Sequence, residues 1–341
     1  MDHRGRLPDP NRMTATGPGR RAVVLGGALG VLGAPAVLAQ GITGWPGDRV
    51  TIVTSLPAGS TVDITTRLYA DQLAQIWNRP VVVDNRGGGN GVLACLMVAR
   101  ARPDGLTLLA TSAMTHAANP ALYVRPPYDA VGDFDAVARY GTSPFVVMAH
   151  KGLRTPTLAA LSARLRAEPG RFSFGAGSVP SRLATELYRQ IIEADVVYVG
   201  YRGNQAGFAD LVNGRIAMMS VDVVGAKPLV DRGDVDAVAL SDAERHPALP
   251  NVPTSAEAGL PAYSFSTWSG IYAPKGTPRE VISRIHADMV AVYAIPEVRA
   301  RIIGMGGSME PPIGPEAFQA FTISEIAAWG RIIRAADMRI E

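Results

Sequence analysis

Short stretches of apolar and β-branched residues, each followed by a polar turn and an amphipathic segment, recur along most of the chain. Residues 49–55 read RVTIVTS and predict a first strand, and the spacing of apolar positions predicts a helix over residues 61–77. The same patterns predict strands at 80–84, 106–111, 143–149, 171–174, 195–199, 215–220, 235–240 and 271–273. Further helices are expected at 91–101, 157–166, 183–192, 206–212, 278–293 and 315–335. Strands that alternate with helices in this way predict an α/β fold with parallel sheets covered on both faces.

The first 39 residues depart from this pattern and have the three parts of an export signal. A basic region ends in Arg20-Arg21, an apolar stretch spans 22–36, and Val37-Leu38-Ala39 places small residues before a cut. Cleavage after Ala39 is therefore expected, and the product would be periplasmic. A membrane anchor is the alternative, but four glycines and Pro35 dilute a stretch that is short for ~30 Å of hydrocarbon. The adjacent arginines fit a twin-arginine signal loosely, so the export route stays open.

Net charge is unevenly distributed along the chain. The whole sequence has 33 Lys and Arg against 30 Asp and Glu, and its pI is about 9.1. Residues 1–39 contain five of the basic and two of the acidic side chains, which leaves 28 of each sign in residues 40–341. A nucleic-acid binder needs a concentrated basic face, so this balance argues against a nucleic-acid partner.

The composition also limits what can stabilise the fold. The single cysteine, Cys95, cannot form an internal disulfide, so stability must come from the hydrophobic core. The 302 residues after Ala39 suffice for two lobes of ordinary domain size. No other segment is typical of a transmembrane helix.

Residue patterns typical of catalysis or metal binding are scarce. The histidines after the leader (His116, His150, His246 and His286) lack metal-ligand spacing, and one cysteine cannot build a thiolate site. The run 175–180 lacks the final glycine of a nucleophile elbow. The glycine-rich run 87–91 lacks the spacing of a dinucleotide fingerprint, and a tight turn explains it as well. The residues therefore predict no metal and no cofactor.

What recurs is a short polar loop that leads into a helix N-terminus. Such loops occupy 57–63, 111–115, 175–181 and 201–205. They would lie at the carboxyl ends of parallel strands, where open α/β sheets bind ligands. Exposed backbone N–H groups and the helix dipole favour an anion there, so a small carboxylate is the predicted ligand. Ordinary capping by Ser and Thr is the alternative for any single loop.

Several longer stretches together resemble one known family. They are 80–91 (PVVVDNRGGGNG), 102–109 (RPDGLTLL), 115–128 with its NPALY, 201–219 (YRGNQAGFADLVNGRIAMM) and 246–259 (HPALPNVPTSAEAG). From about Trp45 to the C-terminus, the chain resembles an extracytoplasmic solute receptor of the tripartite tricarboxylate transporter type, also called the Bug family.

The resemblance implies a type II periplasmic-binding-protein fold, with two α/β lobes that close on a ligand between them. Lobe one would comprise residues 43–142 plus 269–341, and lobe two residues 143–268. The family's ligands are small carboxylates, including dicarboxylates, tricarboxylates, aromatic acids and amino acids. The resemblance thus implies a monomeric, non-enzymatic receptor that delivers a carboxylate to a membrane permease of the tripartite tricarboxylate type.

By the same resemblance, loop backbone amides and ordered waters would hold the ligand carboxylate. The implied ligand contacts are Leu56, Pro57, Ala58, Gly59, Ser60, Thr61, Thr111, Ser112, Thr115, Ser178, Val179, Pro180, Ser181, Tyr201, Asn204, Gln205 and Asp222. Asp63 would stabilise the first helix or contact the ligand directly. Asp222 would order a water, accept from a ligand amine or hydroxyl, or act as a surface cap. Ser60 replaces a usual glycine, and Arg182 stands where the family usually has His. Arg182 would either bind a distal ligand carboxylate or point to solvent.

Other functions remain open at the level of sequence. With the same fold, the protein would be a sensory receptor that transmits ligand binding to a signalling partner. A hydrolase or lyase would use cleft residues such as Ser178 and Asp222. A nucleotide-binding enzyme is a third alternative.

Overall fold

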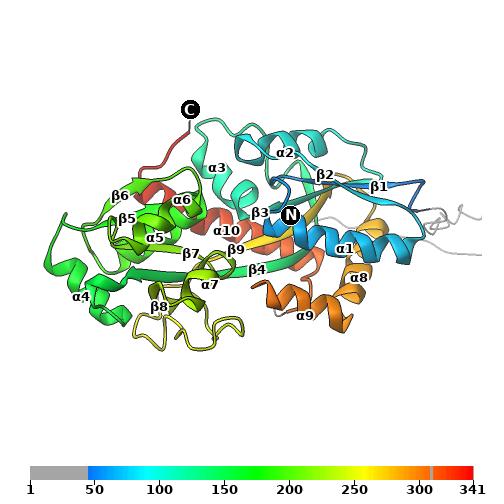
Figure 1. Ribbon diagram of the computed structural model, residues 1–341. Coiled ribbons are helices and arrows are strands. Elements are labelled where there is room, and N and C mark those ends of the chain that lie inside the picture. The colour runs from blue at the N-terminus through cyan, green and yellow to red at the C-terminus, as the bar shows by residue number, and fades with distance from the viewer. Residues whose placement is uncertain (1–44, 308–309, 341) are drawn as a thin grey trace, which may run out of the picture. The chain divides into compact units, whose positions relative to one another are not determined.

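The computed structural model describes residues 45–307 and 310–340 of the chain (Figure 1). The leader predicted over residues 1–39, with its cleavage after Ala39, lies outside the described residues. Within those residues, no helix is both long and apolar enough to span a membrane.

Strands and helices alternate through most of the described chain. The strands are β1 (Val50–Thr54), β2 (Val81–Asn85), β3 (Thr107–Ser112), β4 (Phe134–His150), β5 (Ser173–Ala176), β6 (Val197–Gly200), β7 (Met218–Asp222), β8 (Val235–Leu240) and β9 (Ser266–Pro274). The α-helices are α1 (Thr61–Trp77), α2 (Val92–Ala99), α3 (Asn119–Leu122), α4 (Leu158–Ala167), α5 (Val179–Ile191), α6 (Asn204–Val212), α7 (Val223–Asp231), α8 (Arg279–Tyr293), α9 (Pro296–Gly304) and α10 (Pro315–Ala335). Shorter turns are η1 (Gly89–Gly91), η2 (Met114–Ala118) and η3 (Lys151–Leu153).

The first helix shows how local sequence sets an element. Ser60 caps α1 by accepting a hydrogen bond from the Asp63 amide at 3.2 Å, and the Asp63 carboxylate sits in the first turn, where the dipole favours an anion. The helix ends at Asn78, which adopts the left-handed conformation at φ 50°. Its buried face recurs every four residues: Tyr69, Leu73 and Trp77. The helix predicted over 61–77 is therefore confirmed.

The sheet is mixed rather than purely parallel. Its strand order is β2-β1-β3-β9-β4-β7-β5-β6, and β8 pairs with β4. β1 is parallel to β2 and β3, and β5 is parallel to β6 and β7. The pairs β3–β9, β4–β9, β4–β7 and β4–β8 are antiparallel. The prediction of parallel sheets was right for the outer strands and wrong for those that pair with β4 and β9.

The long strand β4 links the two parallel groups. It has 17 residues, of which 134–144 pair with β9 and 145–150 with β7 and β8. The prediction of a strand at 143–149 covered only its second part. Gly141 to Pro144 contain residues typical of a loop, but here they stay extended because β9 pairs with them.

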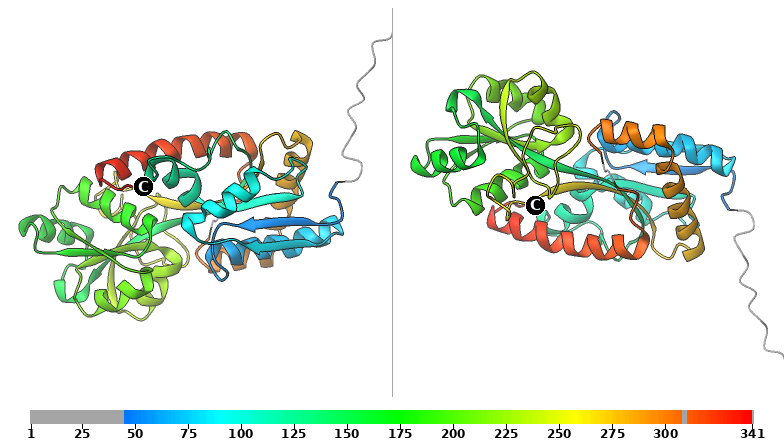
Figure 2. Two further views of the ribbon diagram at one scale, coloured as in Figure 1. Left: turned by 90° about the horizontal axis from the view of Figure 1, so that it is seen from above. Right: turned by 90° about the horizontal axis from the view of Figure 1, so that it is seen from below.

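Apolar side chains gather in separate clusters on the two sides of β4. One cluster packs β1, β3 and β9 against α1 and α8, and another packs β5 and β7 against α4 and α5. A third cluster joins the two sides through Phe145, Phe265 and Trp329. The ring centroid of Phe265 lies 5.1 Å from that of Phe145 and 4.9 Å from that of Trp329. Trp329 belongs to α10, which packs against β4 and contacts α3 and α5 (Figure 2).

Candidate ligand-binding site

A cleft of about 620 Å³ opens at the carboxyl ends of the parallel strands. Leu56 follows β1, Ser112 ends β3, Ser178 follows β5, Asn204 follows β6 and Asp222 ends β7, and all of them line this cleft. The edge where these strands end is where open α/β sheets bind ligands. The structure therefore gathers loops from both parallel groups around one space.

Eleven of the residues implied by the resemblance line the cleft. They are Leu56, Gly59, Ser60, Thr61, Ser112, Ser178, Val179, Pro180, Asn204, Gln205 and Asp222. Pro57 and Ala58 are exposed next to this lining. Thr111, Thr115 and Ser181 are buried beneath it, with at most 1% of each residue exposed. Tyr201 does not line the cleft, and its hydroxyl donates a hydrogen bond to Asp210 Oδ2 at 2.8 Å. Burial, together with this hydrogen bond to a carboxylate, raises the pKa of Tyr201 to about 12.

The first loop is held by a buried carboxylate. Asp63 Oδ2 accepts from the Gly59 amide at 2.9 Å, and Oδ1 accepts from Asn85 Nδ2 at 2.8 Å and Arg67 Nε at 3.0 Å. Asn85 Nδ2 also reaches the Leu56 carbonyl at 3.3 Å. Burial opposes ionisation of Asp63, but these hydrogen bonds outweigh it and lower its pKa. Asp63 therefore positions the loop from beneath.

The second loop is held by its own cap and by a neighbouring loop. Ser178 Oγ accepts from the Ser181 amide at 3.3 Å, and Ser181 Oγ donates to the Ser220 carbonyl at 2.5 Å. Asn204 Oδ1 accepts from the Gly177 amide at 2.9 Å. Gly177 lies so close to the backbone of Gly203 and Asn204 that a side chain at 177 would overlap it. The loops that start α5 and α6 thus form one unit.

A buried row of hydroxyl groups lies under the β3 end of the cleft. Thr111 Oγ1 lies 2.6 Å from Ser55 Oγ and 2.5 Å from Thr115 Oγ1, which in turn lies 2.8 Å from His116 Nδ1. His116 is fully buried and stacks on Tyr272 at 4.0 Å between ring centroids. Burial lowers its pKa to about 3, so the imidazole is neutral near pH 7. These groups support the loop after β3.

Asp222 is the carboxylate of the cleft lining. It caps α7, and its Oδ1 accepts from the Gly225 amide at 2.9 Å. Burial raises its pKa, and hydrogen bonds from backbone amides at the start of α7 oppose that shift.

Apolar walls complete the lining, and sequence reasoning missed them. Phe145, Phe208, Trp268 and Ile302 face the cleft from β4, α6, β9 and α9. The Trp268 Nε1–H donates to Glu325 Oε2 at 3.1 Å, which fixes the indole from α10. Only the tertiary arrangement brings these side chains together, so no local motif marks them.

Arg182, the residue in place of the family's usual His, does not line the cleft. Its guanidinium carbon lies 4.1 Å from the centroid of the Tyr198 ring, and its Nε lies 3.8 Å from Glu186 Oε1. No Lys, Arg or His belongs to the lining among the described residues. Likewise, no group of three or more His, Cys, Asp or Glu in the described chain gathers as a metal site.

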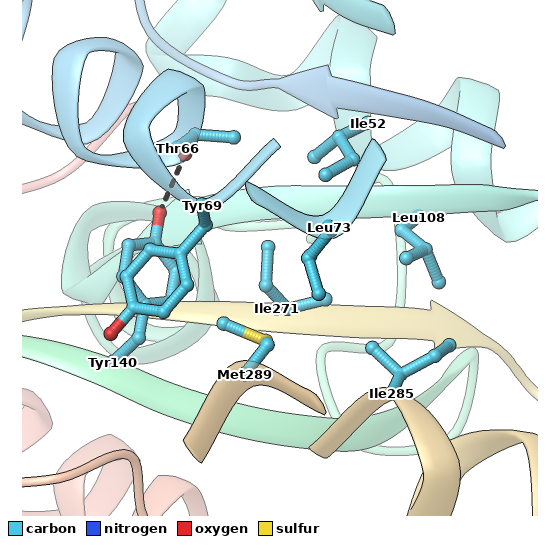
Figure 3. A pocket seen from close by; sticks show the side chains of 9 residues that line it. All are labelled: Ile52, Thr66, Tyr69, Leu73, Leu108, Tyr140, Ile271, Ile285 and Met289. Atoms are coloured by element: carbon cyan, nitrogen blue, oxygen red, sulfur yellow. Dashed lines mark hydrogen bonds between the residues drawn. The ribbon is translucent and has the colours of Figure 1, made fainter. Parts of the chain in front are cut away.

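A second, much smaller cavity lies inside the core. Its volume is about 10 Å³, and apolar side chains of β1, β3, α1, α8 and β9 surround it together with Tyr69 and Tyr140 (Figure 3). A space of this size holds at most one water molecule, so it is a packing gap rather than a ligand site.

The α/β architecture, with its cleft at the strand ends, is that of a solute-binding protein. A sequence model described as the tripartite tricarboxylate transporter family receptor (TctC) matches residues 65–338. The chain belongs to this family, whose members are periplasmic solute receptors rather than enzymes.

Individual relatives agree with this assignment. A UPF0065 protein from the tcbD–tcbE intergenic region of Pseudomonas sp. strain P51 is 33% identical over 318 residues, which is 92% of this chain and 94% of that protein. Protein BugT of Bordetella pertussis is 27% identical, and the alignment covers 92% of this chain and 97% of BugT. Rpa4515 of R. palustris with adipate superposes with TM-score 0.75 at 29% identity, over 86% of this chain and 99% of that one. MatC of Rhodopseudomonas palustris with bound malate superposes with TM-score 0.72 at 28% identity, over 85% of this chain and 100% of MatC.

Proposed function

We propose that the protein is a receptor that captures a small organic carboxylate in the cleft and delivers it to a membrane permease of the tripartite tricarboxylate type. The leader would direct export and be cleaved after Ala39, which would place the receptor in the periplasm. There it would act as a monomer. The ligand-contacting residues would be the eleven implied contacts that line the cleft.

The observation that carries this proposal is the convergence on the cleft of three helix N-termini whose cap residues are neutral. Ser60 caps α1, Ser178 caps α5 and Gly203 precedes α6, and the first residues of these helices line the same space. Each N-terminus stabilises an anion by about 0.3–1 kcal/mol, rising to ~2 kcal/mol when it is partly buried. Hydrogen bonds to a charged ligand add about 1.5–3 kcal/mol each. A few such contacts reach the roughly −8 kcal/mol of micromolar binding.

Two relatives of similar structure support a carboxylate ligand. Rpa4515 was solved with adipate and MatC with malate, and each aligns with this chain over nearly all of its own length.

Capture would proceed by closure of two lobes, residues 43–142 plus 269–341 and residues 143–268. β4 changes partners at Pro144 and Phe145, and β9 begins at Ser266 on the return crossing. Bending at these two adjacent strands would bring the α1 loop towards the α5 loop and remove the ligand from water.

The proposal is tested by thermal shift and calorimetry with the leaderless protein. Adipate, malate, citrate and benzoate are the probes, and adipamide is the uncharged control for adipate. We expect at least one carboxylate to raise the melting temperature by mass action and to reduce the radius of gyration in solution scattering, while adipamide does neither. Equal shifts with adipate and adipamide, or no shift across a broad carboxylate panel, would contradict the proposal.

A further inference from the structure

The helix N-termini at the cleft are not equivalent. Among the described elements, α1, α5 and α6 present neutral caps, whereas α7 is capped by the carboxylate of Asp222. The first turn of α1 also contains Asp63, but Arg67 offsets the charge of this carboxylate with an ion pair of 3.0 Å. An anion is therefore favoured at the first three N-termini. The N-terminus of α7 is already neutralised by its own side chain, and it presents negative charge to the cleft.

In the part of the chain that the structure describes, the cleft lining has no cationic side chain to balance that charge. Among the described residues, Asp222 is the one ionisable carboxylate of the lining, and no cationic side chain accompanies it. Arg182 stacks on Tyr198 instead. A ligand with two carboxylates would therefore place its second anion in a cleft that holds a carboxylate and no cation.

Asp222 can accept a further partner. The backbone amides of Asp222, Val224 and Gly225 donate to its carboxylate, the last to Oδ1 at 2.9 Å, and an ionised carboxylate has about four acceptor positions in all. Phe208 and Val224 line the cleft beside it, and apolar neighbours of this kind strengthen a charge-assisted hydrogen bond. Burial raises the pKa of Asp222, so its ionised form gains from a cationic partner.

We propose that the cleft selects a small carboxylate that also carries a cationic amine, with the ligand carboxylate at the N-termini of α1 and α5 and the ammonium on Asp222. This inference rests on the function proposed above. It narrows the ligand class from carboxylates in general to amino carboxylates, and it makes Asp222 the residue that sets this specificity.

Calorimetry with ligand pairs of matched length tests the inference. The pairs are succinate with 4-aminobutanoate, glutarate with 5-aminopentanoate and adipate with 6-aminohexanoate. In each pair, one terminal carboxylate is replaced by a protonated aminomethyl group. In the pair that fits best, we expect the amino carboxylate to bind at least about tenfold tighter than the diacid. Its ammonium pairs with the Asp222 carboxylate, whereas the second carboxylate of the diacid is repelled by it. Asp222→Asn should remove that preference by weakening the amino carboxylate about tenfold or more while sparing the diacid.

The control variant is Asp231→Asn, which removes the same charge at an exposed carboxylate at the far end of α7, outside the lining. We expect it to leave the ligand preference unchanged. Asn is a good helix cap, and Asp222→Ser is a second neutral capping variant if Asp222→Asn does not fold. A wild-type preference for the diacids, or a preference for amino carboxylates that survives at Asp222→Asn, would overturn the inference and leave the proposed function intact. Failure of every carboxylate, amino or not, would overturn the proposed function.

Discussion

At the scale of single residues, two neighbouring tyrosines differ in one hydrogen bond. Tyr69 and Tyr140 are both buried, at 2% and 1% exposure, and their rings pack edge to face at 5.4 Å. Tyr140 shares a hydrogen bond of 2.8 Å with Thr66 (Figure 3), whereas the Tyr69 hydroxyl has no partner among the described residues. An unpaired buried hydroxyl costs about 1–3 kcal/mol, so the two side chains contribute differently to stability.

We therefore expect opposite outcomes from Tyr69→Phe and Tyr140→Phe. Tyr69→Phe removes an unpaired group and should leave the free energy of unfolding unchanged or raise it by up to ~1 kcal/mol. Tyr140→Phe leaves the Thr66 hydroxyl without its partner and should lower that free energy by about 1–2 kcal/mol. Urea denaturation of both variants measures the difference. An equal loss in both would mean that the Tyr69 hydroxyl has a partner in the adjacent cavity.

The ionisation of Asp63 makes the stability of the protein depend on pH. Its side chain is only 4% exposed, and its pKa lies below the ordinary value of 3.8. A lowered pKa in the folded state contributes stability above the unfolded value, and that contribution is lost as the pH falls through the folded value. We expect Asp63→Asn to lower the free energy of unfolding by about 1.5–3 kcal/mol at pH 7, because Asn replaces a charged acceptor of several hydrogen bonds.

This deficit should shrink as the pH falls from 3.8 towards the lower pKa of the folded state, because the unfolded wild-type chain then binds a proton that the folded carboxylate does not. Denaturation curves at pH 7 and near pH 3 test the trend. Asp84→Asn is the matched control, because Asp84 makes an exposed ion pair of 3.0 Å with Arg86, and such pairs contribute less than about 1 kcal/mol. A deficit for Asp63→Asn that is the same at both pH values would show that the charge is not the cause.

At the scale of elements, local signals predicted the start of α1 at Thr61, but they placed the start of α5 at 183 instead of Val179 and gave no helix over Val223–Asp231. Ser60, Ser178 and Asp222 each accept a hydrogen bond from an amide three residues ahead, as expected of Ser and Asp at helix N-termini. The first part of β4 was not predictable in the same way. Its Gly and Pro residues are typical of a loop, and only pairing with β9, more than 120 residues away in sequence, keeps them extended.

Gly177 tests how two of these elements share one loop structure. A Cβ at this position would overlap the backbone of Gly203 and Asn204, so neither side can yield by a rotamer change. We expect Gly177→Ala to separate the loops before α5 and α6, to lower stability by about 1–3 kcal/mol or more, and to weaken carboxylate binding. Gly304→Ala is the control, since a Cβ there meets nothing within 4 Å. Calorimetry and thermal unfolding of both variants measure the effect, and wild-type binding by Gly177→Ala would contradict it.

At the scale of the whole molecule, the family pattern predicted the arrangement better than local rules did. The mixed sheet depends on which strand the chain returns to at β9, and hydrophobic periodicity contains no such information. The same limit applies to the cleft. The polar residues before the helix N-termini predicted the loops of the cleft. Phe145, Trp268 and Ile302, in contrast, face the cleft only because distant strands and helices meet there.

The single cysteine offers a measure of how the whole fold opens. Cys95 is 0% exposed in the cluster between α2, β3 and α10, and burial raises its pKa to about 12 despite hydrogen bonds from Tyr128 and Thr115. Since the reactive form is the thiolate, a thiol reagent should modify Cys95 only when the surrounding core opens. We expect negligible reaction at pH 8 in native buffer, and rapid reaction in denaturant.

Ligand should slow this reaction if binding and opening are linked through the whole molecule. At 100 times its dissociation constant, a ligand adds about 2.7 kcal/mol to the native state, which corresponds to roughly hundredfold slower modification when opening is global. The control places a thiol on the exposed side of the same helix: Leu93, at 62% exposure, is changed to Cys in a Cys95→Ala background. That thiol should react at once and independently of ligand. Fast, ligand-independent reaction of Cys95 would instead show that α2 opens locally, without the rest of the fold.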